Sequence, residues 1–239
     1  MSSLDNWFKE NNLVINLKKG KTEYVLYGTS QKLKKKSNTN CNINGYNINQ
    51  THSYKYLGVT LDNKINLIDH FHKTYKKASG RIRLLKRIRH NISPSTAASI
   101  YQMMIQPIIF YCNNILVNIP DSHAKKFQYI QDRAKLIINN NEITSKWKNI
   151  QHRRKQLCVI EVFKTLNGLT PSQLNKFETF SHEYKTRGNK TKLKLPKVKS
   201  ENGRKMFNFI GAKIYNELPS SLTSETSLVI FKSKTRDHF

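Results

Sequence analysis

The pattern of apolar positions changes near residue 64 of this 239-residue chain. Before that point, short β-rich runs alternate with polar turns; after it, apolar residues recur every three or four positions. The first residues differ from the rest of the opening block, because Leu4, Trp7 and Phe8 share one face of a helix over residues 2–11. The pattern therefore predicts one helix and short antiparallel strands first, then a helical region.

The opening block carries three strand signals. Residues 22–27 (TEYVLY) are rich in β-forming side chains and stop at a glycine, and the Asn44-Gly45 pair favours a tight type I′ hairpin. Residues 53–62 (SYKYLGVTLD) indicate a single strand that ends in a turn. We expect the carboxylate of Asp62 to cap this turn into the following helix. Residues 30–40 are expected to form a polar, basic loop.

A long amphipathic helix opens the second region. From residue 65 to residue 88 the apolar positions fall in steps of three and four, which predicts about six helical turns. These positions are Ile68, Phe71, Tyr75, Ala78, Ile82, Leu85 and Ile88. His70 and His72 lie two residues apart, so they do not share a helical face; we expect one near the packed side and one in solvent.

Further helices are predicted from their caps and stops. Ser93-Pro94 begins a helix with a capping residue followed by proline, and Pro107 kinks or ends that helix. Asp121 or Ser122 is expected to cap the next helix. Later helices are predicted at residues 152–166, 204–218 and 227–239. The polar, basic stretch 178–203 is expected to be an exposed linker, with a short edge strand around Leu193.

The charge balance indicates a polyanionic partner. The chain has 42 Lys and Arg against 15 Asp and Glu, a formal net charge of +27. Such an excess raises self-repulsion, and a phosphate backbone would relieve it with salt-sensitive affinity. No run of 18 apolar residues occurs and the N-terminus is polar, so we expect no membrane span and no secretory signal. The expected location is intracellular, in the nucleus or the cytoplasm.

The strongest candidate for the contact is the long helix after residue 64. No Asp or Glu occurs between Asp69 and Asp121, so its cations have no acid nearby in sequence. A solvated charged face is the alternative, but uncompensated charge favours phosphate contact. Tyr54 and Tyr56 lie close in sequence and are candidates for contact with sugars or bases. The candidate cations are Lys73, Lys76, Lys77, Arg81, Arg83, Lys86 and Arg87.

Catalytic and metal-binding patterns are missing from the sequence. Metal-assisted phosphoryl or nucleotidyl transfer needs neighbouring carboxylates, whereas the 15 acids here are scattered, with no DD, DxD or ExxE. The three cysteines are isolated and form no CxxC, which excludes a zinc knuckle and leaves free thiols in a reducing compartment as the expectation. Residues 18–22 (KKGKT) lack the upstream glycine of a P-loop. No metal site is therefore predicted.

Several segments, taken in order, carry a resemblance to a known family. They are Trp7 with residues 11–13 (NNL), 15–29 (INLKKGKTEYVLYGT), 43–48 (INGYNI), 53–62 (SYKYLGVTLD), 76–89 (KKASGRIRLLKRIR), 100–112 (IYQMMIQPIIFYC), 130–137 (IQDRAKLI), 203–219 (GRKMFNFIGAKIYNELP) and 227–239 (SLVIFKSKTRDHF). This ordered set resembles the end of the reverse transcriptase of a non-LTR (LINE-like) retrotransposon. The resemblance covers nearly the whole chain, and SYKYLGVTLD is its centre.

The resemblance implies an α+β, mainly α fold. Residues 1–63 would be a partial palm, a small antiparallel sheet with one helix, and residues 64–168 a helical thumb whose basic face tracks the template–primer duplex. Residues 169–203 would be a basic linker and residues 204–239 a short helical C-terminal module. RNA and RNA–DNA duplex are the implied partners.

One catalytic role can be carried over from the family. Its motif-D lysine is thought to donate a proton that favours pyrophosphate departure, and by position this would be Lys21. The family spacing is Asn-x-x-Lys, and Asn16 precedes Lys21 by five residues, so Lys19 is a rival.

The departures from the family limit the expected activity. The fingers, both metal-binding aspartate motifs and the upstream endonuclease are absent from these residues, so the chain alone is expected to be inactive. Mg2+ is expected only for the intact polymerase, and an intact polymerase encoded by the element would have to supply the missing palm. Two alternatives stay open: a non-enzymatic basic ribonucleoprotein component, and an inert remnant whose open sheet edges prevent folding.

Overall fold

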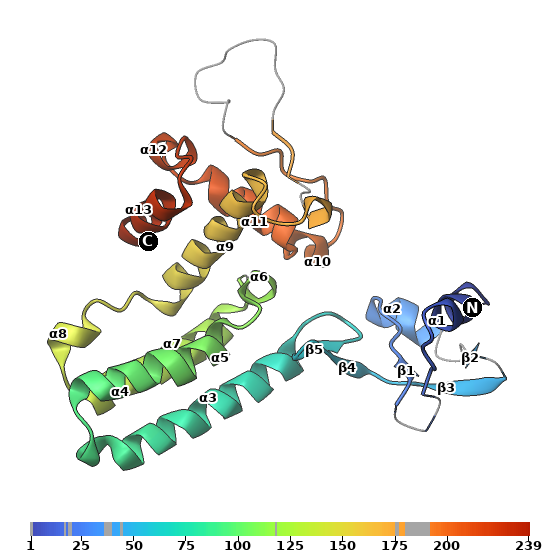
Figure 1. Ribbon diagram of the computed structural model, residues 1–239, viewed down its shortest axis with the longest axis horizontal. Helices are drawn as coiled ribbons and strands as arrows, with labels where there is room; N and C mark the ends of the chain where they lie inside the picture. The colour runs from blue at the N-terminus through green and yellow to red at the C-terminus, as the bar shows by residue number, and fades with distance from the viewer. Residues whose placement is uncertain are drawn as a thin grey trace, which may run out of the picture. The chain divides into compact units, whose positions relative to one another are not determined.

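The computed structural model describes residues 2–16, 18, 21–35, 40–43, 45–117, 119–174, 177–179 and 192–239. The chain divides into two compact units, Met1–Lys73 and Thr74–Phe239 (Figure 1). Among the described residues, the strands lie in the first unit, apart from a bridge between Thr179 and Leu193, and helices dominate the second unit. The mainly helical α+β class is therefore confirmed.

The first unit begins with a helix and a small three-stranded sheet. Its elements are α1 (Ser2–Glu10), β1 (Glu23–Tyr24), α2 (Ser30–Lys35), β2 (Cys41–Ile43) and β3 (Tyr46–Gln50). Strands β2 and β3 are antiparallel, and Ile43 lies opposite Tyr46, which leaves a two-residue loop between them. Gly45 in this loop has a φ of +81°, a conformation that glycine adopts without strain. The hairpin predicted from Asn-Gly is confirmed.

Two features of this part of the chain differ from the prediction. Strand β1 covers only two residues of the predicted stretch 22–27, and it pairs with β3 in parallel, so the sheet is mixed rather than purely antiparallel. The segment expected to be a loop contains α2, rich in Lys and Gln, which are good helix formers. The backbone N–H of Leu33 donates to the carbonyl of Thr29 over 2.9 Å and starts this turn.

The central sequence SYKYLGVTLD is a hairpin, and the single strand predicted there is wrong. Strands β4 (Ser53–Tyr56) and β5 (Val59–Asp62) pair antiparallel, with Tyr56 opposite Val59. The two residues between them, Leu57 and Gly58, have φ values of +44° and +85°. Positive φ at both positions is the geometry of a type I′ turn. The turn escaped prediction because leucine seldom adopts positive φ.

The loop after β5 is organised by Asp62. Its carboxylate accepts hydrogen bonds from the backbone N–H groups of Lys64, Asn66 and Leu67, over 3.0, 3.2 and 2.8 Å. Three charge-assisted bonds to backbone donors fix the chain just before the long helix begins. The predicted capping role of Asp62 is confirmed.

The long basic helix is α3 (Ile68–Ile88). Of the predicted apolar face, Phe71, Ala78, Ile82 and Leu85 are buried, whereas the terminal Ile68 and Ile88 are exposed. At its C-terminal end, the Arg89 guanidinium donates to the backbone carbonyls of Ile137 and Ile138, over 3.1 and 2.9 Å. These carbonyls belong to the last turn of α7 (Asp121–Ile138), where helix geometry leaves acceptors unpaired.

The remaining helices of the second unit follow the predicted order. They are α4 (Pro94–Ile100), α5 (Gln106–Phe110), α6 (Asn113–Leu116), α7, α8 (Asn141–Thr144), α9 (Ile150–Leu166), α10 (Glu201–Arg204), α11 (Phe207–Asn216), α12 (Ser220–Thr223) and α13 (Leu228–His238), with short 3-10 turns at Arg89–Asn91 and Ser172–Leu174. Ser93 caps α4, as predicted, by accepting from the N–H of Thr96 over 3.1 Å. Pro120 rather than Asp121 or Ser122 occupies the cap position of α7.

The kink predicted at Pro107 takes the form of a π-helical turn. This turn, η2 (Tyr101–Ile105), joins α4 to α5, with Pro107 in the first turn of α5. Proline cannot donate a backbone hydrogen bond, and widening the preceding turn is a known way for a helix to accommodate that loss.

The C-terminal helices pack on α9 in the same unit. Phe163 of α9 stacks on Phe231 of α13, with ring centroids 4.2 Å apart. Leu193 was expected in an exposed linker. It is instead buried in the hydrophobic core that includes Phe163 and Phe231. Its backbone N–H and carbonyl both bond to the side-chain amide of Asn216, each over 2.8 Å. The division into palm, thumb, linker and C-terminal module stays a prediction.

Arg154 is buried in the centre of the second unit, with only 1% of its surface exposed. Its guanidinium donates to the side-chain oxygen of Asn113 over 3.1 Å and to the carbonyl of Ile109 over 2.7 Å. It also lies over the rings of Phe110 and Phe127, at 5.5 and 5.3 Å from their centroids. Burial lowers the pKa of this guanidinium to about 10. No carboxylate is among these contacts.

Two further structural findings concern membranes and thiols. In the described part of the chain, no helix has the length and apolar character needed to cross a bilayer. Cys41, Cys112 and Cys158 are free thiols, and Cys158 is buried, which raises its pKa to about 12.

Replacing Arg154 with methionine is predicted to destabilise the protein by about 3 kcal/mol, because Asn113 and Ile109 lose a buried donor. Adding Asn113→Leu to Arg154→Met should recover part of that loss, since removing both partners leaves fewer unsatisfied groups. Urea denaturation measures both effects. Lys155→Met is the control, an exposed cation on the same helix that should change stability by less than about 0.5 kcal/mol. A loss no larger than the control's would contradict the role given to Arg154.

Two glycine-to-alanine changes are predicted to act in opposite directions. At Gly211 an added Cβ would lie 2.9 Å from Cγ2 of Val162, so Gly211→Ala should destabilise by about 1–3 kcal/mol through overpacking. At Gly80, inside α3, an added Cβ meets nothing within 4 Å. Gly80→Ala should therefore stabilise by about 0.5–1 kcal/mol, since alanine favours a helix interior. Thermal unfolding of both variants checks the two signs.

Candidate nucleic-acid interface

An open groove of about 710 Å³ lies along α3 in the second unit. Six of the predicted cations line it, together with Gly80, Leu84 and one residue of α7, Arg133. The six are Lys76, Lys77, Arg81, Arg83, Lys86 and Arg87. We call this feature the α3 groove; it gathers most of the residues that the sequence singled out.

Helical spacing explains why these side chains gather. Residues 76, 80, 83 and 87 are three or four apart and share a face, and residues 77, 81 and 84 form the adjacent row. Gly80 has no side chain and lines the middle of the groove. From residue 76 to residue 87 the helix extends about 16 Å, a length over which duplex DNA carries about ten phosphates.

The charge in the α3 groove is uncompensated. Among the ion pairs found in the described residues, none involves the six cations of α3. Arg133 of α7 adds a seventh positive charge, and its guanidinium lies 5.8 Å from the ring centroid of exposed Tyr129. Seven cations without a carboxylate partner make a surface that attracts a polyanion.

Arg133 and Tyr129 were missed in the sequence analysis. Both lie on α7, four residues apart, on a helix interpreted only for its apolar face. Their spacing puts them on one face, but nothing in the sequence showed that this face lies beside α3. Arg89, by contrast, is a structural cation, because its guanidinium is engaged with the end of α7.

Lys73, the remaining predicted cation of α3, lies in the first unit and contacts the second hairpin. Its Nζ donates to Oγ1 of Thr60 over 3.3 Å. The N–H of Thr60 donates to Nδ1 of His70 over 3.4 Å. Burial, and secondarily the charge of Lys73, lower the pKa of His70. His70 is buried and His72 exposed, as predicted.

The other predicted residues lie in the first unit and are described there alone. Tyr54 and Tyr56 project from the same side of β4 and are 45% and 60% exposed. Lys21 is an exposed turn residue just before β1, and its backbone N–H donates to the carbonyl of Lys18 over 3.0 Å. Its rival Lys19 lies outside the described residues.

Metal-binding side chains do not gather in the described segments. No group of three or more His, Cys, Asp or Glu there is placed to hold a metal ion.

Two curated proteins are similar to part of this chain. The RNA-directed DNA polymerase from mobile element jockey of Drosophila melanogaster is 27% identical over 95 residues, which are 38% of this chain and 10% of that protein. The polymerase of the same name from Drosophila funebris is 31% identical over 94 residues, 37% of this chain and 10% of that protein. This chain thus matches only a small part of the length of either relative. No protein-family model and no solved structure matches it.

The matched part confirms the resemblance seen in the sequence. In each comparison the aligned residues make up more than a third of this chain. A segment of this chain is therefore related to the reverse transcriptases of non-LTR retrotransposons.

Proposed function

We propose that this chain is a fragment of the RNA-directed DNA polymerase of a non-LTR retrotransposon that binds template–primer nucleic acid. The observation that carries the proposal is the α3 groove, where six cations of one helix line an open surface without acidic partners. RNA and RNA–DNA duplex are the proposed ligands. We propose nucleic acid rather than another polyanion because the similar proteins are RNA-directed DNA polymerases.

The groove chemistry fits binding that tolerates different sequences. Lysine and arginine on an exposed helix contact phosphates, which position a duplex but carry no base information. Releasing condensed counterions from the duplex supplies the driving force, so affinity falls steeply as salt rises. Arg133, and Tyr129 beside it, extend the same surface onto α7.

Catalysis would need groups from outside this sequence. The 15 acidic residues contain no neighbouring pair of the kind that holds two metal ions. We therefore propose that the chain alone does not polymerise, and that Mg2+ binds only where an intact polymerase supplies the missing carboxylates. In such an assembly Lys21 is the proposed proton donor to departing pyrophosphate, and Tyr54 and Tyr56 are proposed contacts to the nucleic acid.

A non-enzymatic ribonucleoprotein component would use the same groove. The similarity to the jockey polymerases favours the polymerase-fragment proposal, since such a component has no reason to share it. The proposed compartment is the cell interior, nucleus or cytoplasm, where RNA is available.

Neutralising the groove is predicted to reduce the salt dependence of duplex binding. The triple variant Lys77→Gln/Arg83→Gln/Arg87→Gln removes three exposed cations, which should lower the slope of log affinity against log salt by about 2.7. Fluorescence anisotropy with a labelled RNA–DNA duplex at several salt concentrations measures this slope.

The matched control removes three exposed cations elsewhere in the second unit. Lys197→Gln/Lys199→Gln/Lys213→Gln changes the net charge equally but lies outside the α3 groove. Its salt slope should stay close to that of the unchanged chain. Equal losses in both variants would mean that net charge, rather than the groove, holds the duplex.

The purified chain is predicted to give no primer extension. With magnesium, all four dNTPs and an annealed primer–template, a gel should show the primer at its original length, because no carboxylate pair is available. A duplex-binding measurement on the same preparation shows that the protein is active in binding. A magnesium-dependent extended product would refute the assignment of the catalytic groups to another polypeptide.

A further inference from the structure

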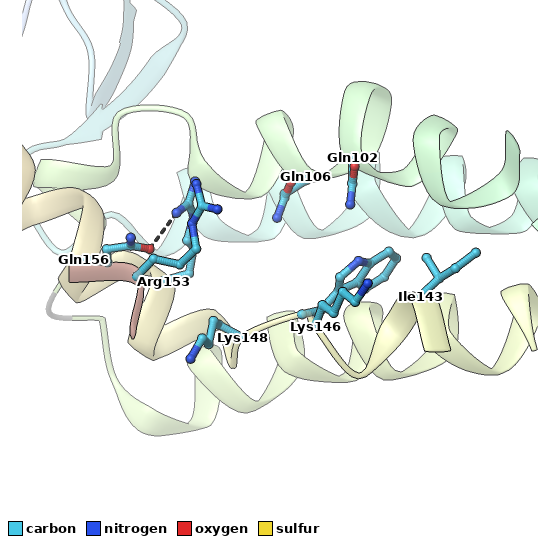
Figure 2. Close-up of a pocket in the computed structure, with 9 residues that line it drawn as sticks. Gln102, Gln106, Ile143, Lys146, Lys148, Arg153 and Gln156 are labelled. Atoms are coloured by element: carbon cyan, nitrogen blue, oxygen red, sulfur yellow. Dashed lines mark hydrogen bonds between the residues drawn. The ribbon is translucent and has the colours of Figure 1, made fainter. Parts of the chain in front are cut away.

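A second basic hollow, of about 600 Å³, lies in the same unit beside the start of α9 (Figure 2). Residues from four separate parts of the chain meet there. Gln102 and Gln106 come from the π-helical turn and α5, Lys146 and Lys148 from the segment between α8 and α9, Arg153 from α9, and Arg236 from α13. We call this hollow the α9 pocket.

Polar side chains line two facing walls of the hollow. Figure 2 shows Gln102 and Gln106 extending from one wall toward the opposite segment that carries Lys146 and Lys148, with Arg153 at one end. Trp147 also lines the pocket, and its ring stacks on buried Tyr101 with centroids 4.5 Å apart and planes within 17°. The aromatic wall is therefore held in place by the core.

Among the described residues, four cations line the α9 pocket and no acid does. Burial, and secondarily the charge of Arg236, lower the pKa of Arg153. Arg153 donates to the side-chain oxygen of Gln156, which is itself buried, so the guanidinium is oriented by a neutral amide. Two arginines that line the same hollow and repel each other are stabilised when an anion binds beside them.

Tertiary packing builds this arrangement. Arg236 reaches the pocket because α13 packs on α9 through the Phe163–Phe231 stack. The segment bearing Lys148 is tied to α7, where Gln131 Nε2 donates to the carbonyl of Lys148 over 2.9 Å. On the same helix, Gln128 accepts from the N–H of Ile150 over 3.0 Å. The cations are thus placed by contacts that do not involve a ligand.

We infer that the α9 pocket binds a nucleotide unit of an unpaired nucleic-acid strand. The cations suit a phosphate group, and the amides of Gln102 and Gln106 offer the paired donor and acceptor that base edges bond to. A hollow of about 600 Å³ is in the range that encloses a small organic ligand. A duplex hides its base edges in the stack, whereas an unpaired strand presents its bases to pockets and aromatic side chains.

This inference does not rest on the α3 groove. The groove is an open surface along one helix, lined almost entirely by cations, and fits a duplex backbone. The α9 pocket is concave and combines cations with amides and an indole. The two sites share no lining residue, so each can be removed separately.

The test uses the indole in the pocket as the reporter. The chain has two tryptophans, so Trp7→Phe leaves Trp147 as the sole one. Titrating this variant with a short unpaired RNA of mixed sequence should change the tryptophan emission to saturation. Inorganic phosphate and ATP, titrated separately, distinguish a free anion and a free nucleotide from a strand; either one binding as tightly as the RNA would overturn the inference.

Two variants of the pocket are compared with a control of equal charge. Arg153→Gln/Arg236→Gln and, on the exposed segment, Lys146→Gln/Lys148→Gln should each weaken unpaired RNA about tenfold by removing phosphate contacts. The control Lys197→Gln/Lys213→Gln should stay within about twofold. Thermal unfolding identifies any variant that has lost its fold. If the arginine double variant has unfolded, the result for the exposed Lys146→Gln/Lys148→Gln variant decides the test.

The same RNA annealed to DNA separates the two sites. Duplex affinity should be unchanged in the pocket variants and reduced in the groove variant Lys77→Gln/Arg83→Gln/Arg87→Gln. Loss of unpaired RNA binding only in the groove variant, or equal loss of both ligands in the pocket variants, would overturn the pocket as a strand site. Failure of the groove variant to alter duplex binding would instead overturn the proposed function and leave the pocket result intact.

Discussion

The second unit depends on a buried positive charge that no acid neutralises. Arg154 is 1% exposed; its two terminal nitrogens donate to the side chain of Asn113 and the carbonyl of Ile109, and the guanidinium lies over two aromatic rings. Its buried Nε has no hydrogen-bond partner in the described part of the chain. Because those partners lie on or beside α5, α6 and α7, one guanidinium ties three helices to α9. A hydrophobic residue could fill the volume but could not pair the oxygens around it. The α3 groove includes one residue of α7, and the α9 pocket includes residues of α5 and α9, so both candidate sites use helices that this interaction joins.

Neighbouring arginines on α9 show how the structure separates structural charge from functional charge. Arg154 has neutral acceptors on several sides, whereas Arg153 has one amide and faces a second arginine. The same contrast holds between α3 and the 3-10 turn that follows it: Arg89 of that turn is engaged with helix-end carbonyls, and the groove cations of α3 are not. In a chain with a net charge of +27, net charge alone locates no site.

Local chemistry was predictable from the sequence, and long-range placement was not. The helices, the Asp62 cap and the hairpin at residues 44 and 45 follow from periodicity and turn residues within a few positions. The turn at Leu57-Gly58 was missed because leucine rarely adopts positive φ, so its presence does not indicate a turn. Leu193 was assigned to an exposed linker because its sequence neighbours are polar, although its own side chain is buried. The cations of α3 were predicted because they lie on one helix, whereas no short-range pattern connects Gln102, Trp147 and Arg236.

The two proposed sites together match what a template-copying enzyme needs. A template is paired with its product on one side of the point of synthesis and unpaired on the other, so a protein that holds it must accept both forms. Helix α7 contributes Arg133 to the groove, and its Gln128 and Gln131 hold the segment that carries the pocket lysines. One helix thus supports both the proposed duplex surface and the proposed strand pocket, and it fixes the separation between them. Binding energy from both sites would then favour a junction over either form alone.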